Sequence, residues 1–142
     1  MVNFGSLRFG ALGFALLTLP ACGGSTFAMV PDAQAVFAKG EVSVDSVSDN
    51  GNGKYTVKVD HLGDPAKLNP SAKVYVVWMM PKGKEDANIQ NMGAISVDSD
   101  YSGEHSFNST FKAFEITLTP EPSADVTKPS GRDVLKTSVA VD

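Results

Sequence analysis

The chain of 142 residues contains one cysteine, Cys22, and two histidines, His61 and His105. A structural disulfide needs two cysteines, so the sequence excludes an internal disulfide. Structural zinc sites need several Cys or His ligands at short spacings, and these three residues show no such spacing. The fold is therefore expected to depend on its hydrophobic core alone.

The chain also lacks a long apolar run and a cluster of basic residues. Its longest apolar stretch, residues 9–19, is shorter than the roughly 20 residues that a membrane-spanning helix needs. Twelve basic and 16 acidic residues give a net charge of −4, and the two signs are interspersed. We therefore expect no nucleic-acid partner.

The apolar stretch 9–19 has the length and position of a signal-peptide core, since one positive charge and no acidic residue precede it. Residues 19–22, "LPAC", then resemble the lipobox of bacterial lipoproteins. In that family the cysteine thiol receives a diacylglycerol group, and the peptide is cut just before it. The resemblance implies a signal peptide over residues 1–21 and a lipidated Cys22 as the first mature residue, attached to a membrane.

Two other interpretations of this segment stay open: an ordinary secretory peptide with a coincidental cysteine, and an N-terminal membrane anchor. The lipoprotein interpretation predicts a cell-envelope protein that faces the periplasm or the cell surface. Gly23 follows the cysteine where an aspartate would retain such proteins in the inner membrane of enteric bacteria. The outer membrane is therefore favoured over the inner one.

After residue 39 the sequence shows the alternation of short β-strands separated by Gly, Pro, Asn and Asp. The predicted strands cover residues 41–47, 54–61, 74–80, 93–100, 104–110, 114–120 and 133–141. We therefore predict an all-β fold, an antiparallel β-sandwich of immunoglobulin-like type with about seven strands after the signal-peptide helix. Residues 22–39 are predicted to be a tether and residues 40–142 the domain.

The predicted strand 74–80 is apolar on both faces. Tyr75, Val77 and Met79 would lie on one face, opposite Trp78 and its neighbours. Because one face of a sandwich strand normally meets water, we expect a cover over Tyr75, Val77 and Met79, from the loop 82–92 or the N-terminal segment. The alternative is that these three residues form an exposed interface for a partner.

Over residues 74–135 the chain resembles the extracytoplasmic C-terminal domain of anti-sigma-K factors. The shared features are Tyr75 and Trp78 in one strand, Gly93 before Ile95 and Val97, the segments 119–122 and 129–131, and Val134 with Leu135. The resemblance implies a sensor-like or adaptor-like β domain that binds a protein partner in the envelope. The sigma-binding helical domain and the membrane helix of that family have no counterpart in this sequence.

Signs of catalysis are weak, so we expect no enzyme, no catalytic residues and no cofactor. The lipidated Cys22 would offer no thiol, and no Gly-x-Ser-x-Gly motif is present. Asp98, Asp100 and Ser102 match positions 1, 3 and 5 of an EF-hand loop. Ser109 stands at position 12 in place of glutamate, and flanking helices are missing, so these residues are only a weak calcium candidate. A β-turn explains them equally well.

Two further functions stay open. One is a structural envelope lipoprotein or assembly subunit whose strand edge pairs with neighbours. The other is a carbohydrate-binding lipoprotein with an aromatic platform. The available rings are Tyr75, Trp78, Tyr101, Phe107, Phe111 and Phe114. Most of them fall at positions expected to face inward, which favours core packing for these rings.

Overall fold

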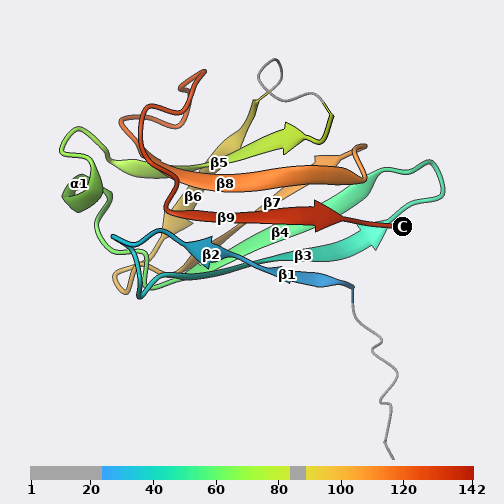
Figure 1. The fold of residues 1–142 in the computed structure, drawn as a ribbon, viewed down its shortest axis with the longest axis horizontal. Coiled ribbons are helices and arrows are strands. Elements are labelled where there is room, and N and C mark those ends of the chain that lie inside the picture. Colours follow the sequence, from blue (N-terminus) through green and yellow to red (C-terminus); the bar gives the residue numbers. More distant parts are fainter. Residues whose placement is uncertain (1–23, 84–88) are drawn as a thin grey trace, which may run out of the picture.

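The computed structural model describes residues 24–83 and 89–142, so the predicted signal peptide, Cys22 and residues 84–88 lie outside it. Within the described segments the chain forms nine strands and one short helix (Figure 1). None of the helical structure in these segments is long and apolar enough to cross a membrane.

The strands follow one another along the chain with short connections. They are β1 (Thr26–Ala28), β2 (Val30–Pro31), β3 (Lys39–Val47), β4 (Gly53–Asp60), β5 (Val74–Pro81), β6 (Gln90–Val97), β7 (Gly103–Ser109), β8 (Ala113–Glu121) and β9 (Leu135–Ala140). The helix α1 (Pro65–Leu68) lies between β4 and β5, and the Asp64 carboxylate caps its first turn by accepting from the Ala66 N–H at 2.9 Å.

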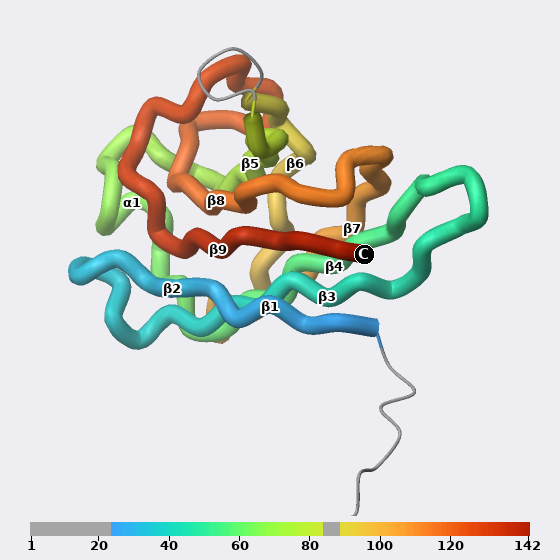
Figure 2. The backbone as a smooth tube through the Cα atoms, turned by 45° about the vertical axis from the view of Figure 1, so that its right-hand side comes forward, coloured from blue at the N-terminus to red at the C-terminus, as the bar shows by residue number. Residues whose placement is uncertain are grey.

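All nine strands belong to one antiparallel sheet with the order β1-β3-β4-β7-β6-β5-β8-β9-β2. The two edge strands, β1 and β2, are consecutive in the chain and are separated only by Met29. The sheet must therefore curl until its edges meet, which gives a nearly barrel-shaped molecule (Figure 2). Met29 is buried at this junction, and its N–H donates to the Gly40 carbonyl at 2.8 Å.

The prediction of an all-β antiparallel fold is confirmed. Each of the predicted segments after residue 39 overlaps one strand, from β3 to β9. The predicted count of about seven strands is too low, because β1 and β2 precede them. The prediction of a tether over residues 22–39 is also corrected from residue 24 onward: β1 pairs with β3, β2 pairs with β9, and Ala35 and Ala38 are buried.

An aromatic cluster joins the two sides of the curled sheet. Tyr55 of β4 stacks on Phe107 of β7 with ring centroids 5.5 Å apart, and Phe114 of β8 meets the Tyr55 ring edge-on at 5.1 Å. Tyr55 and Phe114 are almost fully buried. These rings pack β8 against β4 and β7 across the interior, which accounts for their inward positions.

The two faces of β5 are both buried, but in different surroundings. Tyr75, Val77 and Met79 belong to the main hydrophobic core, with exposed fractions of at most 1%. The expectation that these residues are covered therefore holds, but they face the main core and not an outer surface, and the alternative of an exposed interface is wrong. Periodicity gives no direction to a strand that is apolar on both sides.

The opposite face of β5 carries Val76 and Trp78, which are fully buried outside the main core cluster. Residues 122–134, here called the cover segment, cross this face. Asn91, which pairs with Trp78 in the sheet, donates from Nδ2 to the carbonyls of Ala124 at 2.9 Å and Val126 at 2.8 Å. Figures 1 and 2 show the cover segment on the side of β5 and β8 that faces away from β3 and β4.

The ionisation of the Tyr75 hydroxyl reports how deeply this side chain is buried in the core. Its hydroxyl donates to the Gly63 carbonyl at 2.8 Å and the Leu62 carbonyl at 3.3 Å. Burial, and after it the charges of Asp64 and Tyr101, raise the pKa of Tyr75 to about 12 from 10.0.

Above pH 10 the unfolded chain gives up the Tyr75 proton while the folded protein keeps it, so stability is expected to fall as the pH rises toward 12. Tyr75→Phe removes this contribution. Urea unfolding across this pH range should show a shallower decline for Tyr75→Phe than for the unchanged protein. Parallel declines would contradict the assignment.

Candidate functional site

One end of the barrel carries a loop, residues 32–38, that is built from two consecutive turns. The Ala35 N–H donates to the Asp32 carbonyl at 2.9 Å, and the Ala38 N–H donates to the Ala35 carbonyl at 2.8 Å. Ala35 and Ala38 point inward and are buried. Small inward residues allow the loop to pack closely on the barrel, which gives it a defined backbone path.

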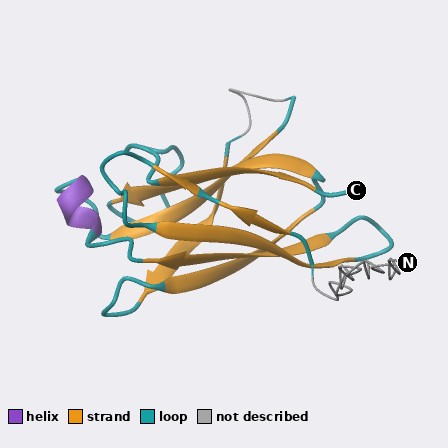
Figure 3. Ribbon diagram, turned by 60° about the horizontal axis from the view of Figure 1, so that its bottom comes forward, coloured by secondary structure: helices purple, strands orange, loops and turns teal. Residues whose placement is uncertain are grey.

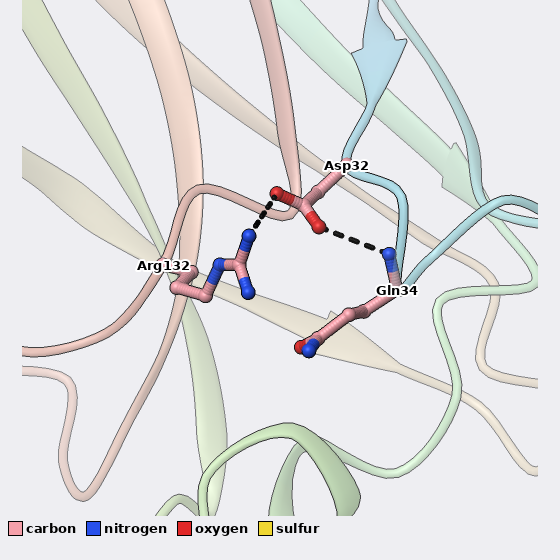
Figure 4. Close-up of polar contacts among 3 residues, drawn as sticks. All are labelled: Asp32, Gln34 and Arg132. Carbon is pink, nitrogen blue, oxygen red and sulfur yellow. Dashed lines mark hydrogen bonds and ion pairs between the residues drawn. The ribbon is translucent and has the colours of Figure 1, made fainter.

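Asp32 ties this loop to the cover segment (Figure 4). One carboxylate oxygen accepts from the Gln34 N–H at 2.9 Å, and the other meets Arg132 Nη2 at 3.3 Å. The Asp32 N–H also donates to the Val134 carbonyl at 2.9 Å. Because Arg132 is largely exposed, its ion pair adds little stability; the pair chiefly orients the two segments.

Val36 and Phe37 occupy the centre of the second turn and project into solvent. Their exposed fractions are 60% and 83%, and Phe37 is the more exposed of the two. Turn centres usually carry Gly, Pro, Asn, Asp or Ser, since these residues suit the backbone and the solvent. A Val-Phe pair at the tip of a well-braced turn is an apolar projection of the kind that marks a contact surface.

A shallow hollow of about 220 Å³ lies beside Phe37. Its walls come from the loop, the β4–α1 connection and α1. They include Ala35, Phe37, His61, Leu62, Lys67 and Leu68. We refer to Val36, Phe37 and this hollow together as the loop-end surface. It combines a projecting ring with an adjacent recess of mixed polarity, which suits contact with a folded protein more than enclosure of a small molecule.

A second feature is a group of hydrogen-bonded side chains behind the cover segment. We call this group, Trp78, Thr119, Glu121 and Ser130, the polar clasp. Glu121 is fully buried at the end of β8. Its carboxylate accepts from the Thr119 hydroxyl at 2.7 Å, from the Ser130 N–H at 2.8 Å and from the Ser130 hydroxyl. Trp78 Nε1 donates to Thr119 Oγ1 at 2.8 Å. The clasp therefore links Trp78 of β5 through β8 to the cover segment.

Sequence reasoning missed both features. Residues 32–38 fall within the predicted tether, although the pair Val36-Phe37 between two alanines is a visible signal. Glu121 and Ser130 lie in the segments of the anti-sigma-K resemblance, but nothing in the sequence pairs them with Trp78. Proximity in the fold makes them one unit.

The weak calcium candidate forms a β-turn between β6 and β7. Asp98 accepts through one oxygen, Oδ1, from the N–H groups of Asp100 at 2.9 Å and Ser102 at 3.0 Å. The Tyr101 N–H donates to the Asp98 carbonyl at 3.0 Å. The structure thus gives Asp98 and Ser102 a turn-forming role, and Asp100 is exposed. Among the residues described, no group of three or more His, Cys, Asp or Glu could hold a metal ion.

The two histidines have separate surroundings. His61 has a positive φ of 57° after β4 and lines the hollow of the loop-end surface. His105 on β7 contacts the Met92 carbonyl through Nε2 at 2.7 Å. Neither forms an ion pair with a carboxylate in residues 24–83 and 89–142.

The rings considered for a carbohydrate platform are mostly interior. Tyr75, Trp78 and Phe114 are fully buried, and Phe107 is 7% exposed. These four rings cannot stack on a sugar.

No protein-family model matches the chain, and no curated protein matches it significantly.

Proposed function

We propose that this protein is a lipid-anchored, extracytoplasmic binding module with a sensor-like role, which contacts a protein partner through its loop-end surface. Cys22 would be the lipidated anchor, and the module would lie in the cell envelope, at the outer membrane in preference to the inner membrane. It would act by binding, without catalysis or a cofactor.

The observation that carries this proposal is the exposure of Phe37 and Val36 on a braced loop. Exposing both side chains forgoes about 1.5–3 kcal/mol of burial for each. The loop is held by the Asp32 contacts and by the buried Ala35 and Ala38, so the exposed pair does not result from a loosely packed segment. A persistent cost of this kind is typical of residues that become buried in a complex.

A relation to anti-sigma-K C-terminal domains is the second part of the proposal, and it includes a two-layer, immunoglobulin-like arrangement of the strands. Its support is spatial. Three elements of the resemblance, namely Trp78, segment 119–122 and segment 129–131, meet at the polar clasp. These three elements therefore form one structural unit in this protein, which supports a relation to that family. The loop-end surface lies outside the segments that resemble the family.

Site-specific photocross-linking in the intact envelope tests the contact surface. A photoreactive phenylalanine analogue at position 37 is expected to give one defined protein adduct. The same analogue at position 47 is the matched control, because Val47 is also exposed but is the last residue of β3, at the opposite end of that strand from the loop. Adducts of equal yield from both positions, or none from position 37, would contradict the proposal.

The Val36→Ser, Phe37→Ser double variant provides the complementary test. It should abolish partner binding while leaving the free energy of unfolding within about 0.5 kcal/mol, because both side chains are already exposed. The variant Val47→Ser should bind normally.

An assembly subunit is the second candidate, and the edge of β9 favours it. The short β2 pairs only with Leu135 and Lys136, and from Thr137 to Ala140 no described strand pairs with β9 on that side, although β1 and β3 lie close to it. A strand from a neighbour could pair there if it displaced β1 from this edge. Native mass measurement separates the candidates, since a strict monomer counts against assembly.

A further inference from the structure

The described part of the chain begins at Gly24, two residues after the proposed anchor. A Cβ atom built on Gly24 would lie 1.6 Å from the Val44 carbonyl oxygen and 2.8 Å from its carbon. Both atoms are backbone, so no flexible side chain could move aside. The next residue, Ser25, accepts from the Val44 N–H at 2.9 Å. Glycine at position 24 therefore lets the chain lie directly on β3.

Only Gly23 separates Cys22 from this contact in the sequence. The two intervening residue steps span at most about 7 Å. The polar layer on each side of a bilayer is of similar thickness, about 5–8 Å, which is half the difference between the full bilayer and its hydrocarbon core. An acylated Cys22 would therefore hold Gly24 at the level of the lipid headgroups.

The position of Gly24 identifies which end of the barrel meets the membrane. From Val44, β3 continues to Val47 and the turn 48–52. The carboxyl terminus lies on the same side, where the Val141 N–H donates to the Lys112 carbonyl at 2.8 Å (Figure 1). Helix α1 lies at the opposite end in Figures 1 and 3. The loop-end surface is lined by α1 and belongs to that opposite end.

We infer that the acylated protein is seated directly on the headgroup layer of its own membrane through residues 45–52, 110–112 and 141–142, and presents the loop-end surface away from the bilayer. This inference rests on the proposed lipidation of Cys22. The occupant of this surface is the zwitterionic headgroup layer, because both charge signs occur at this end. The charged residues are Asp45, Asp49, Lys112 and Asp142.

The same geometry sets the height of the loop-end surface. The chain runs from Gly24 through β1 and β2 to Pro31, which at about 3.3 Å per residue covers roughly 20–25 Å. Phe37 would then stand at this distance above the headgroups. A partner would have to approach from the aqueous side, whereas lipid could not reach Phe37.

Headgroup quenching measures this orientation. The acylated protein is placed in phosphatidylethanolamine and phosphatidylcholine vesicles that contain a headgroup spin label. A fluorophore is attached at Asp49→Cys in one sample and at Lys67→Cys of α1 in another, both at exposed positions. We expect quenching to be several-fold stronger at position 49 than at position 67. Equal quenching at both positions would overturn the inference.

A longer linker provides the matched control. An insertion of about ten Gly and Ser residues between Gly23 and Gly24, with a root-mean-square span of roughly 17 Å, should bring the two quenching values together. Unchanged values would show that the orientation does not come from the short linker and would contradict the inference. Partition of the same samples into a detergent phase reports acylation. Without acylation the proposed anchoring fails, whereas acylation with equal quenching defeats the orientation alone.

Discussion

Trp78→Ala is expected to lower the free energy of unfolding by about 3–5 kcal/mol, measured by urea denaturation with circular dichroism. Trp78 is fully buried between β5 and the cover segment, and its indole N–H is bonded to Thr119. Removing the ring would leave a large void on a face of the sheet that the main core does not reach. The cover segment is fixed by the hydrogen bonds of Asn91 and Glu121 and by the buried Val134, so we expect it not to fill that void.

Trp78→Phe separates packing from hydrogen bonding at this site. It keeps most of the ring volume but loses the bond to Thr119 Oγ1, so a smaller loss of about 1–2 kcal/mol is expected. Equal losses for the alanine and phenylalanine variants would contradict the view that Trp78 acts chiefly by filling space under the cover segment.

Glu121→Ala is the second large effect, with an expected loss of about 2–4 kcal/mol. The carboxylate is fully buried and accepts from Thr119 and twice from Ser130. Its removal leaves the Thr119 hydroxyl without its acceptor inside the protein and releases Ser130. The cover segment would loosen, which limited proteolysis within residues 122–134 would detect as faster cleavage.

Two variants sharpen the Glu121 test. Glu121→Gln keeps the volume and one acceptor oxygen, so it should lose less stability than alanine. Glu115→Ala alters a half-buried carboxylate on the same face of β8 and is expected to change stability by less than about 0.5 kcal/mol. If Glu115→Ala and Glu121→Ala had equal effects, the clasp would have no special part in holding the cover segment.

The Trp78 and Glu121 effects are expected to be non-additive. Both residues bond to Thr119, so each substitution already disturbs the partner of the other. The double variant should therefore lose less stability than the sum of the single losses. A strictly additive result would mean that the ring and the carboxylate hold the cover segment independently.

Strands with one polar face could be predicted from the sequence, because alternation shows the buried side. In β4, Tyr55, Val57 and Val59 are buried, as their spacing predicts. The orientation of β5 could not be predicted, since apolar residues on both faces give no periodic signal. Tyr75, Val77 and Met79 face the main core, whereas the cover segment lies on the opposite face of β5. The sequence does not show which face of β5 that segment covers.

The edge strands and the site needed the three-dimensional structure. β1 and β2 have three and two residues, too few for a periodic pattern, and their partners β3 and β9 lie far apart in the chain. The exposure of Phe37 depends on Ala35 and Ala38 packing inward, which reverses the usual placement of large and small apolar residues. Trp78 and Thr119, which are bonded to each other in the clasp, lie 41 positions apart in the sequence.

The link to the proposed anchor and the loop-end surface lie at opposite ends of the molecule. The short link from Cys22 to Gly24 would hold one end on the membrane, and the loop-end surface would present Phe37 at the other. The cover segment and its clasp stabilise the side of the barrel between them. The proposed binding at Phe37 and the proposed anchoring at Cys22 should therefore be separable by substitution, because no residue is shared between the two ends.

Anchoring through Cys22 is tested most directly by the mass of the amino-terminal peptide of the protein isolated from membranes. The expected peptide begins at Cys22 and carries a diacylglycerol group on the thiol. A peptide that begins at another residue, or a Cys22 with a free thiol, would contradict the membrane-anchored module.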